Sequence, residues 1–91
     1  MDGKKIGEVT HFYNGLCVAV IELSDTIQDG DDVHFLGGLT DFCQKVKSIQ
    51  IEHEQVESAG KGEEIALKVD MRVRKGDKVF KLTEAQAETN R

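Results

Sequence analysis

Proline and tryptophan are absent from this chain of 91 residues, and aromatic side chains make up only 5% of it. Without proline, tight turns depend on glycine, asparagine and aspartate, and nine glycines supply that need. The scarcity of aromatic rings leaves few platforms on which nucleic-acid bases could stack. No apolar run approaches the roughly 20 residues of a membrane-spanning helix, and the opening MDGKKIGEV lacks the apolar segment of a secretory signal. We therefore expect a cytoplasmic protein.

Acidic side chains outnumber basic ones by 17 to 12, which gives a net charge of −5. Non-specific binding to nucleic acid depends on lysine and arginine that neutralise phosphates, so this balance argues against it, although a local basic patch stays open. The length favours one domain. We predict a single domain over residues 1–82 and a polar, frayed tail over residues 83–91.

Catalytic and cofactor signatures are missing. The phosphate-binding pattern G-x-x-x-x-G-K-[ST] does not occur. The histidines His11, His34 and His53 are isolated, and Cys17 and Cys43 are too far apart for a C-x-x-C metal site. Both cysteines lie in apolar runs, so we interpret them as small buried hydrophobes; a disulfide would require adjacent strands and an oxidising compartment. These absences predict a non-enzymatic protein without cofactor, metal or GTP.

Apolar and polar residues alternate with a period of two, most clearly where Ile65, Leu67, Val69, Met71 and Val73 alternate with polar or small residues. This period is typical of a strand with one face in a core. Turn signals such as Asn14-Gly15 separate the runs. Strands are expected at residues 4–13, 16–23, 31–36, 42–54, 63–73 and 78–82, with bulges at Gly7 and near Lys47 or Ser48.

Short strands with turns at near-regular spacing predict an all-β fold, in the form of a small closed antiparallel barrel with six or seven strands. The residues expected in its core are apolar members of these runs: Val18, Val20, Val33, Phe35, Val46, Ile49, Ile65, Leu67, Val69 and Val79.

Several pieces of the chain resemble, in order and spacing, the second domain of translational GTPases such as elongation factor Tu. These pieces are IGEV at 6–9, GLCVAV at 15–20, IQDGD at 27–31, VKSIQ at 46–50, HE at 53–54 followed by VESA at 56–59, GEEIAL at 62–67 and RKGD at 74–77. The resemblance spans about residues 5–82 and implies a domain II-like, six-stranded barrel, here free-standing because the GTPase domain is missing. A similar barrel also resembles the C-terminal appendage of collagenase-like peptidases, again without the catalytic part.

Two functions remain open at this point. The resemblance implies a binding module that contacts ribosomal RNA, a transfer RNA or a translation-related protein. Basic residues give this function some support: Lys45, Lys47, Arg72, Arg74, Lys75, Lys78 and Lys81. The alternative is a protein–protein interaction module that docks on a separately encoded enzyme, which the acidic balance favours slightly.

The resemblance places the family's groove near the stretch matched by residues 51–59 and the glycine loop that follows. We therefore predict a partner-binding surface on residues 51–62 together with a basic strand end. Its members are polar, basic or glycine residues: His53, Glu54, Gly60, Gly62, Arg72, Arg74 and Lys75. Glycine allows a partner to approach the backbone closely. The alternative interpretation is a solvated loop.

Overall fold

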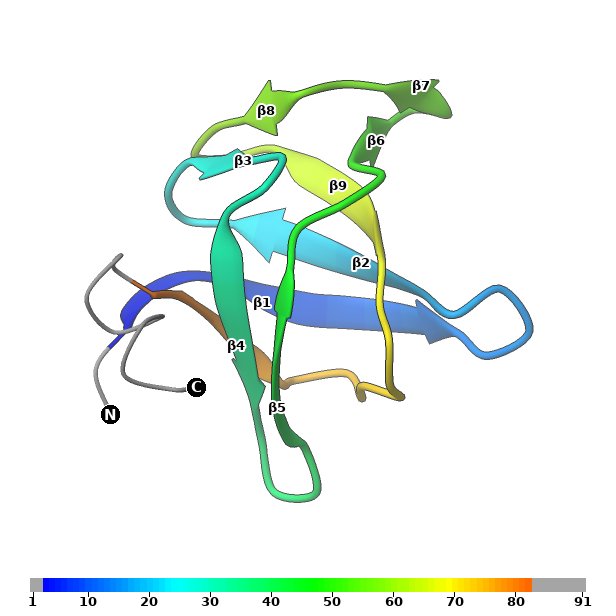
Figure 1. Cartoon of the computed structure of the whole chain (residues 1–91). Helices are drawn as coiled ribbons and strands as arrows, with labels where there is room; N and C mark the ends of the chain where they lie inside the picture. Colours follow the sequence, from blue (N-terminus) through cyan, green and yellow to red (C-terminus); the bar gives the residue numbers. More distant parts are fainter. Residues whose placement is uncertain (1–2, 83–91) are drawn as a thin grey trace.

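The computed structural model describes residues 3–82, and within this part every regular element is a β-strand (Figure 1). The strands are β1 Lys4–Tyr13, β2 Val18–Leu23, β3 Ile27–Gln28, β4 Asp32–Leu36, β5 Asp41–Lys45, β6 Gln50–Ile51, β7 Glu54–Gln55, β8 Ser58–Ala59, β9 Glu64–Lys68 and β10 Lys78–Lys81. The tail predicted at 83–91 lies outside the described residues. None of the described residues forms a helix long and apolar enough to cross a membrane.

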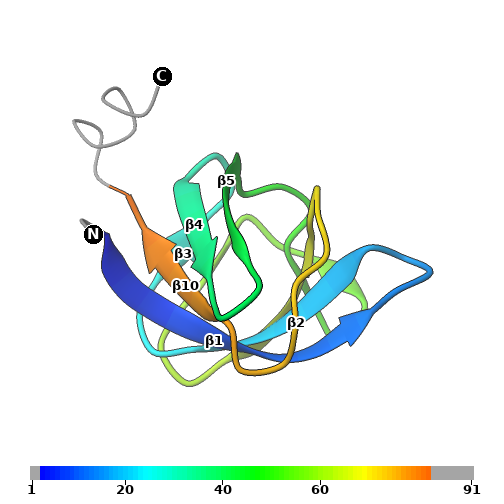
Figure 2. The same ribbon diagram turned by 90° about the horizontal axis from the view of Figure 1, so that it is seen from below.

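Eight strands form one antiparallel sheet in the order β5-β4-β10-β1-β2-β9-β6-β7, and β3 pairs with β8 in a second, two-stranded sheet. The all-β prediction is confirmed. The sheet curls around a common interior (Figure 2), but its end strands β5 and β7 are not hydrogen-bonded neighbours in the described part of the chain. The predicted closed barrel of six or seven strands is thus replaced by an open, curled sheet.

Two predicted strands are shorter in the structure than expected. The predicted strand at 42–54 divides into β5, β6 and β7, since Ser48, Glu52 and His53 have φ of 58°, 51° and 70°. The predicted strand at 63–73 ends at Lys68, which leaves Met71 59% exposed instead of buried. The positive φ values at Ser48, Glu52 and His53 are incompatible with a pleated strand.

The predicted bulge at Gly7 is confirmed by a register shift between Lys5 and Gly7 in the pairing of β1 with β10. Gly7 also packs tightly against β2. A Cβ atom at this position would lie 2.7 Å from Cγ2 of Ile21 and 2.9 Å from the carbonyl oxygen of Glu22. Glycine is therefore needed here for the close approach of the two backbones.

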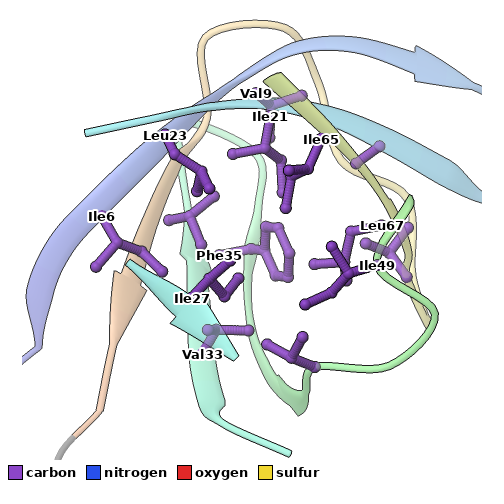
Figure 3. Packing of buried hydrophobic residues seen from close by; sticks show 14 of the residues in the cluster. Ile6, Val9, Ile21, Leu23, Ile27, Val33, Phe35, Ile49, Ile65 and Leu67 are labelled. Carbon is purple, nitrogen blue, oxygen red and sulfur yellow. The ribbon is translucent and has the colours of Figure 1, made fainter. Parts of the chain in front are cut away.

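One apolar cluster fills the interior, with Phe35 near its centre (Figure 3). Its buried members are Ile6, Val9, Ala19, Ile21, Leu23, Ile27, Val33, Phe35, Val46, Ile49, Ala59, Ile65, Leu67, Val69, Val73 and Val79. The ring of Phe42 on β5 stacks on Phe35 at a centroid distance of 5.1 Å. Eight of the ten predicted core residues are buried.

The predictions for Val18 and Val20 are wrong, because both side chains lie on the outer face of β2 and are only partly buried. The run LCVAVIEL is apolar at consecutive positions, so the sequence does not show which of its residues face the core and which face outward. Pairing with β9 sets the phase, since Ala19 lies opposite Leu67 and both are buried.

The prediction that Cys17 and Cys43 are buried is also wrong. Both are free, exposed cysteines. Cys17 lies in the turn after β1 with φ of 55°, and Cys43 occupies the outward phase of β5.

Candidate functional groove

A hollow of about 520 Å³ lies on the outer face of β2, β9 and β6; we call it the outer groove. Three residues form a row across the paired strands β2, β9 and β6. Ala66 of β9 is opposite Val20 of β2 on one side and Gln50 of β6 on the other. Side chains at paired positions share one face of a sheet. The single methyl of Ala66 between two larger residues leaves the space that forms the floor of the outer groove.

The β6–β7 hairpin provides one wall of the outer groove. Gln50 pairs with Gln55 and Ile51 with Glu54, which leaves Glu52 and His53 as a two-residue loop. Both loop residues have positive φ, the pattern of a type I′ turn. The turn holds a carboxylate and an imidazole at the groove.

Glu63, just before β9, and Glu64, its first residue, also line the outer groove, and Tyr13 at the end of β1 contributes its ring. Oε1 of Glu63 accepts the backbone N–H of Gly60 at 2.6 Å, which fixes the loop before β9. Tyr13 is 47% exposed, and its ring centroid lies 4.4 Å from that of His11. The outer groove therefore combines an apolar floor with carboxylates along its rim.

The structure brings part of the predicted surface to this groove. His53 lines it, and Glu54 begins β7 directly after the turn. Gly60 and Gly62 lie in the loop before β9. The N–H of Gly62, with φ of 90°, donates to the carbonyl of Leu23 at 2.9 Å. Left-handed backbone of this kind favours glycine, so Gly62 has a structural use in addition to any contact with a partner.

The basic half of the predicted surface lies elsewhere. Arg72, Arg74 and Lys75 are in the connection from β9 to β10, where the N–H of Arg74 donates to Oδ2 of Asp77 at 2.8 Å. Figure 1 shows this connection at the lower edge of the molecule and the β6–β7 turn at the upper edge. The structure thus separates the two groups, and a partner-binding role for either one stays a prediction.

Sequence reasoning missed Tyr13, Val20 and Ala66 as groove residues. The unbroken apolar run at 16–21 contained a signal, because a strand with apolar residues on both faces needs cover on both. Which residues faced outward could only be settled by the register with β9.

A cysteine, a histidine and an aspartate meet on the β4–β5 hairpin. Nε2 of His34 lies 2.6 Å from Oδ1 of Asp41, and Cys43 is directly opposite His34 in the ladder. Partial desolvation of the Cys43 thiol by its neighbours raises its pKa, and the carboxylates of Asp41 and Asp32 raise it further. A nucleophilic thiolate is favoured by a lowered pKa, and the shift at Cys43 has the opposite direction.

No family model matches the chain. It is 42% identical over 81 residues to an uncharacterized protease of Methanocaldococcus jannaschii, a match that covers 88% of this chain and 20% of the protease. It is 33% identical over 78 residues to a collagenase of Porphyromonas gingivalis, with 84% of this chain and 22% of the collagenase covered. The chain thus spans about a fifth of the length of the curated relatives it matches.

Two solved structures have the same fold, and both are of the C-terminal domain of a Geobacillus thermoleovorans protein assigned as a U32 peptidase. One gives a TM-score of 0.82 at 19% identity and covers 88% of this chain and 93% of that domain. Its selenomethionine variant gives 0.81 at 19% identity, with 85% and 98% covered. The matched domain is therefore nearly the size of this chain.

These comparisons overturn the translation-factor interpretation. The relatives are proteases, and the matched structures belong to a C-terminal domain assigned to a peptidase. The resemblance to an elongation-factor domain II was therefore wrong as an identification, and the translation-related function is wrong with it. The second resemblance, to the C-terminal appendage of collagenase-like peptidases, agrees with the comparisons.

Proposed function

We propose that this chain is a non-catalytic module that docks on the catalytic part of a U32-type peptidase. The observation that carries the proposal is the difference in coverage: the chain matches 20% of a protease but 93% of a solved C-terminal domain. A unit of this size is an accessory domain of the larger protein. The proposal retains the alternative function from the sequence, a protein–protein interaction module that docks on an enzyme. It now specifies that this enzyme is a peptidase.

The residues support a docking role over a catalytic one. The β4–β5 hairpin brings together His34, Asp41 and Cys43, but the raised pKa of the Cys43 thiol opposes its use as a nucleophile. In the part of the chain that the structure describes, no group of three or more histidine, cysteine, aspartate or glutamate side chains is placed to hold a metal ion.

A domain exchange tests the proposal. The M. jannaschii protease is produced whole, without the segment that matches this chain, and with this chain in place of that segment. We expect the shortened protein to lose solubility or thermal stability and the exchanged protein to regain most of it. Because the two segments are 42% identical, many of the docking contacts should be retained.

A second measurement uses the chain in trans. Light scattering coupled to gel filtration should show a one-to-one complex between this chain and the shortened protease. If no complex forms and the exchanged protein is no more stable than the shortened one, the docking function is wrong. Hydrolysis of casein by the isolated chain, abolished by Cys43→Ser, would contradict the non-catalytic part.

A further inference from the structure

The rim of the outer groove holds negative charge that the described residues do not neutralise. Several acidic side chains elsewhere are paired with lysine, among them Asp25 with Lys4, Asp32 with Lys45 and Asp70 with Lys47, at 2.6, 3.0 and 2.6 Å respectively. Within residues 3–82, Glu52, Glu63 and Glu64 take part in no such pair.

The strand register adds to the charge argument at Glu64. Glu22 of β2 and Glu64 of β9 are directly opposite each other in the ladder, and both are exposed. Like charges at paired positions destabilise a sheet. In the described residues neither carboxylate has a salt-bridge partner; Oε2 of Glu64 accepts only a long bond of 3.4 Å from Oγ1 of Thr10. A cation brought by a partner would relieve this repulsion.

The apolar floor indicates what accompanies the cation. Val20 and Ala66 offer aliphatic surface, and Tyr13 offers a half-exposed ring. A hollow of about 520 Å³ is large enough for a few side chains. The stem of an arginine or lysine can lie along such a surface while its head group reaches a carboxylate.

We propose that the outer groove binds an extended protein segment that places an arginine or lysine against Glu64 and Glu52 and an apolar side chain over Ala66. The choice of a protein as the occupant rests on the docking function proposed above. Arginine suits the site best, because its planar head group binds carboxylates with two parallel hydrogen bonds.

The test uses two synthetic peptides, acetyl-GVRLRVG-amide and acetyl-GVELEVG-amide, titrated into the isotope-labelled chain at 50 mM salt. The backbone amide signals of residues 50–53 and 63–66 and of Tyr13 should shift with the basic peptide and stay in place with the acidic one. Shifts that spread evenly over the acidic surface, or no shift with either peptide, would overturn the proposal.

Two charge-reversing variants separate the groove from general attraction. Glu64→Lys should weaken binding of the basic peptide at least fivefold, whereas Glu57→Lys, an exposed control with the same change of charge outside the outer groove, should weaken it less than twofold. Equal losses in both variants would mean that only the net charge matters, and the proposal would fall.

Glu64→Lys also provides its own folding control. Because it replaces a like-charge pair with an opposite-charge pair next to Glu22, its melting temperature should be equal to or above that of the natural chain. Loss of binding in a more stable protein cannot be due to unfolding. Ala66→Tyr, which fills the hollow from an outward-facing strand position, should block the peptide with at least a fivefold loss of affinity.

The peptide titration and the domain exchange can fail separately, so their results distinguish the groove proposal from the docking function. If the chain docks on the shortened protease and Glu64→Lys leaves that complex unchanged, the docking function holds and the outer groove is not the contact. If the basic peptide binds in the groove but no complex with the protease forms, the peptide site holds and the docking function fails. Groove shifts caused by a uridine oligonucleotide in place of the basic peptide would identify a nucleic-acid site and overturn the proposal.

Discussion

The side-chain oxygen of Gln44 accepts the backbone N–H of Asp70 at 2.7 Å and so joins β5 to the chain that follows β9. Nε2 of the same side chain donates to the carbonyl of Lys68 at 3.0 Å. A single buried amide thus replaces, at this edge, the backbone bonds that a neighbouring strand would make. The strand β5 is at the end of the eight-stranded order, so this contact holds an edge that the ladder leaves open.

Gln44→Leu should lower the free energy of unfolding by about 1–3 kcal/mol, because the N–H of Asp70 and the carbonyl of Lys68 lose their partner. Urea unfolding followed by circular dichroism measures the loss. Gln55→Leu is the matched control, since Gln55 is exposed on β7 and should change stability by less than about 0.5 kcal/mol. Equal effects in the two variants would show that the Gln44 contacts add nothing.

Two adjacent glycines differ sharply in what surrounds them. A Cβ atom on Gly37 would overlap the carboxylate of Asp77, with Cγ only 2.7 Å away, whereas nothing lies within 4 Å of a Cβ on Gly38. Asp77 is 4% exposed and accepts the N–H of Arg74, so it cannot move away freely. Gly37→Ala should therefore cost about 1–3 kcal/mol, and Gly38→Ala less than about 0.5 kcal/mol. Similar melting temperatures for the two variants would contradict this packing.

The parts of the fold that could be predicted are those in which the period of two was unambiguous. Ile65 and Leu67 alternate with exposed or half-buried residues and face the core as expected. Val18 and Val20 were assigned to the wrong face, because an unbroken apolar run has no phase until a neighbouring strand supplies the register. That error hid the outer groove, whose floor is the outward face of this run.

The sequence predicted the candidate site only in part, at the residues that lie in or beside turns. His53 and the glycine loop stood out in the sequence, and His53 lines the outer groove. Arg72 and Arg74 were grouped with them because a strand was expected to continue to residue 73. The strand ends at Lys68, and the chain then turns toward Val9, whose carbonyl accepts the N–H of Gly76 at 2.8 Å. Long-range contacts of this kind leave no trace in local sequence.

The carboxyl group of Asp25 should titrate below its ordinary pKa of 3.8. The hydrogen bond from Lys4 lowers the pKa most, at 2.6 Å between Nζ and Oδ2, and the backbone N–H of Thr26 lowers it further. A lowered pKa means that these contacts stabilise the fold above pH 3.8 and that their contribution is lost as the pH falls through the folded-state value. Carboxyl carbon shifts in an NMR titration report this pKa directly.

Lys4→Met should move the pKa of Asp25 upward while leaving it below 3.8, because the Thr26 bond remains. Lys5→Met is the control, since Lys5 lies 3.9 Å from Glu8 and is not among the groups that lower the Asp25 pKa. An unchanged pKa in Lys4→Met would show that the ion pair does not persist in solution.

The last prediction concerns the β6–β7 turn. Two of its residues carry side chains although their left-handed backbone conformation favours glycine. Glu52 and His53 have φ of 51° and 70° in a two-residue loop, and the second position of such a turn is usually glycine. His53→Gly should relieve the left-handed strain and raise the free energy of unfolding by about 0.5–1 kcal/mol, the gain being limited by the greater freedom of glycine in the unfolded chain. His11→Gly makes the same chemical change within the extended strand β1, where it should lower stability by about 0.5–1 kcal/mol. Opposite signs in the two urea melts are the expected result, and a loss of stability in both variants would mean that the imidazole of His53 contributes more to the folded turn than its backbone conformation costs.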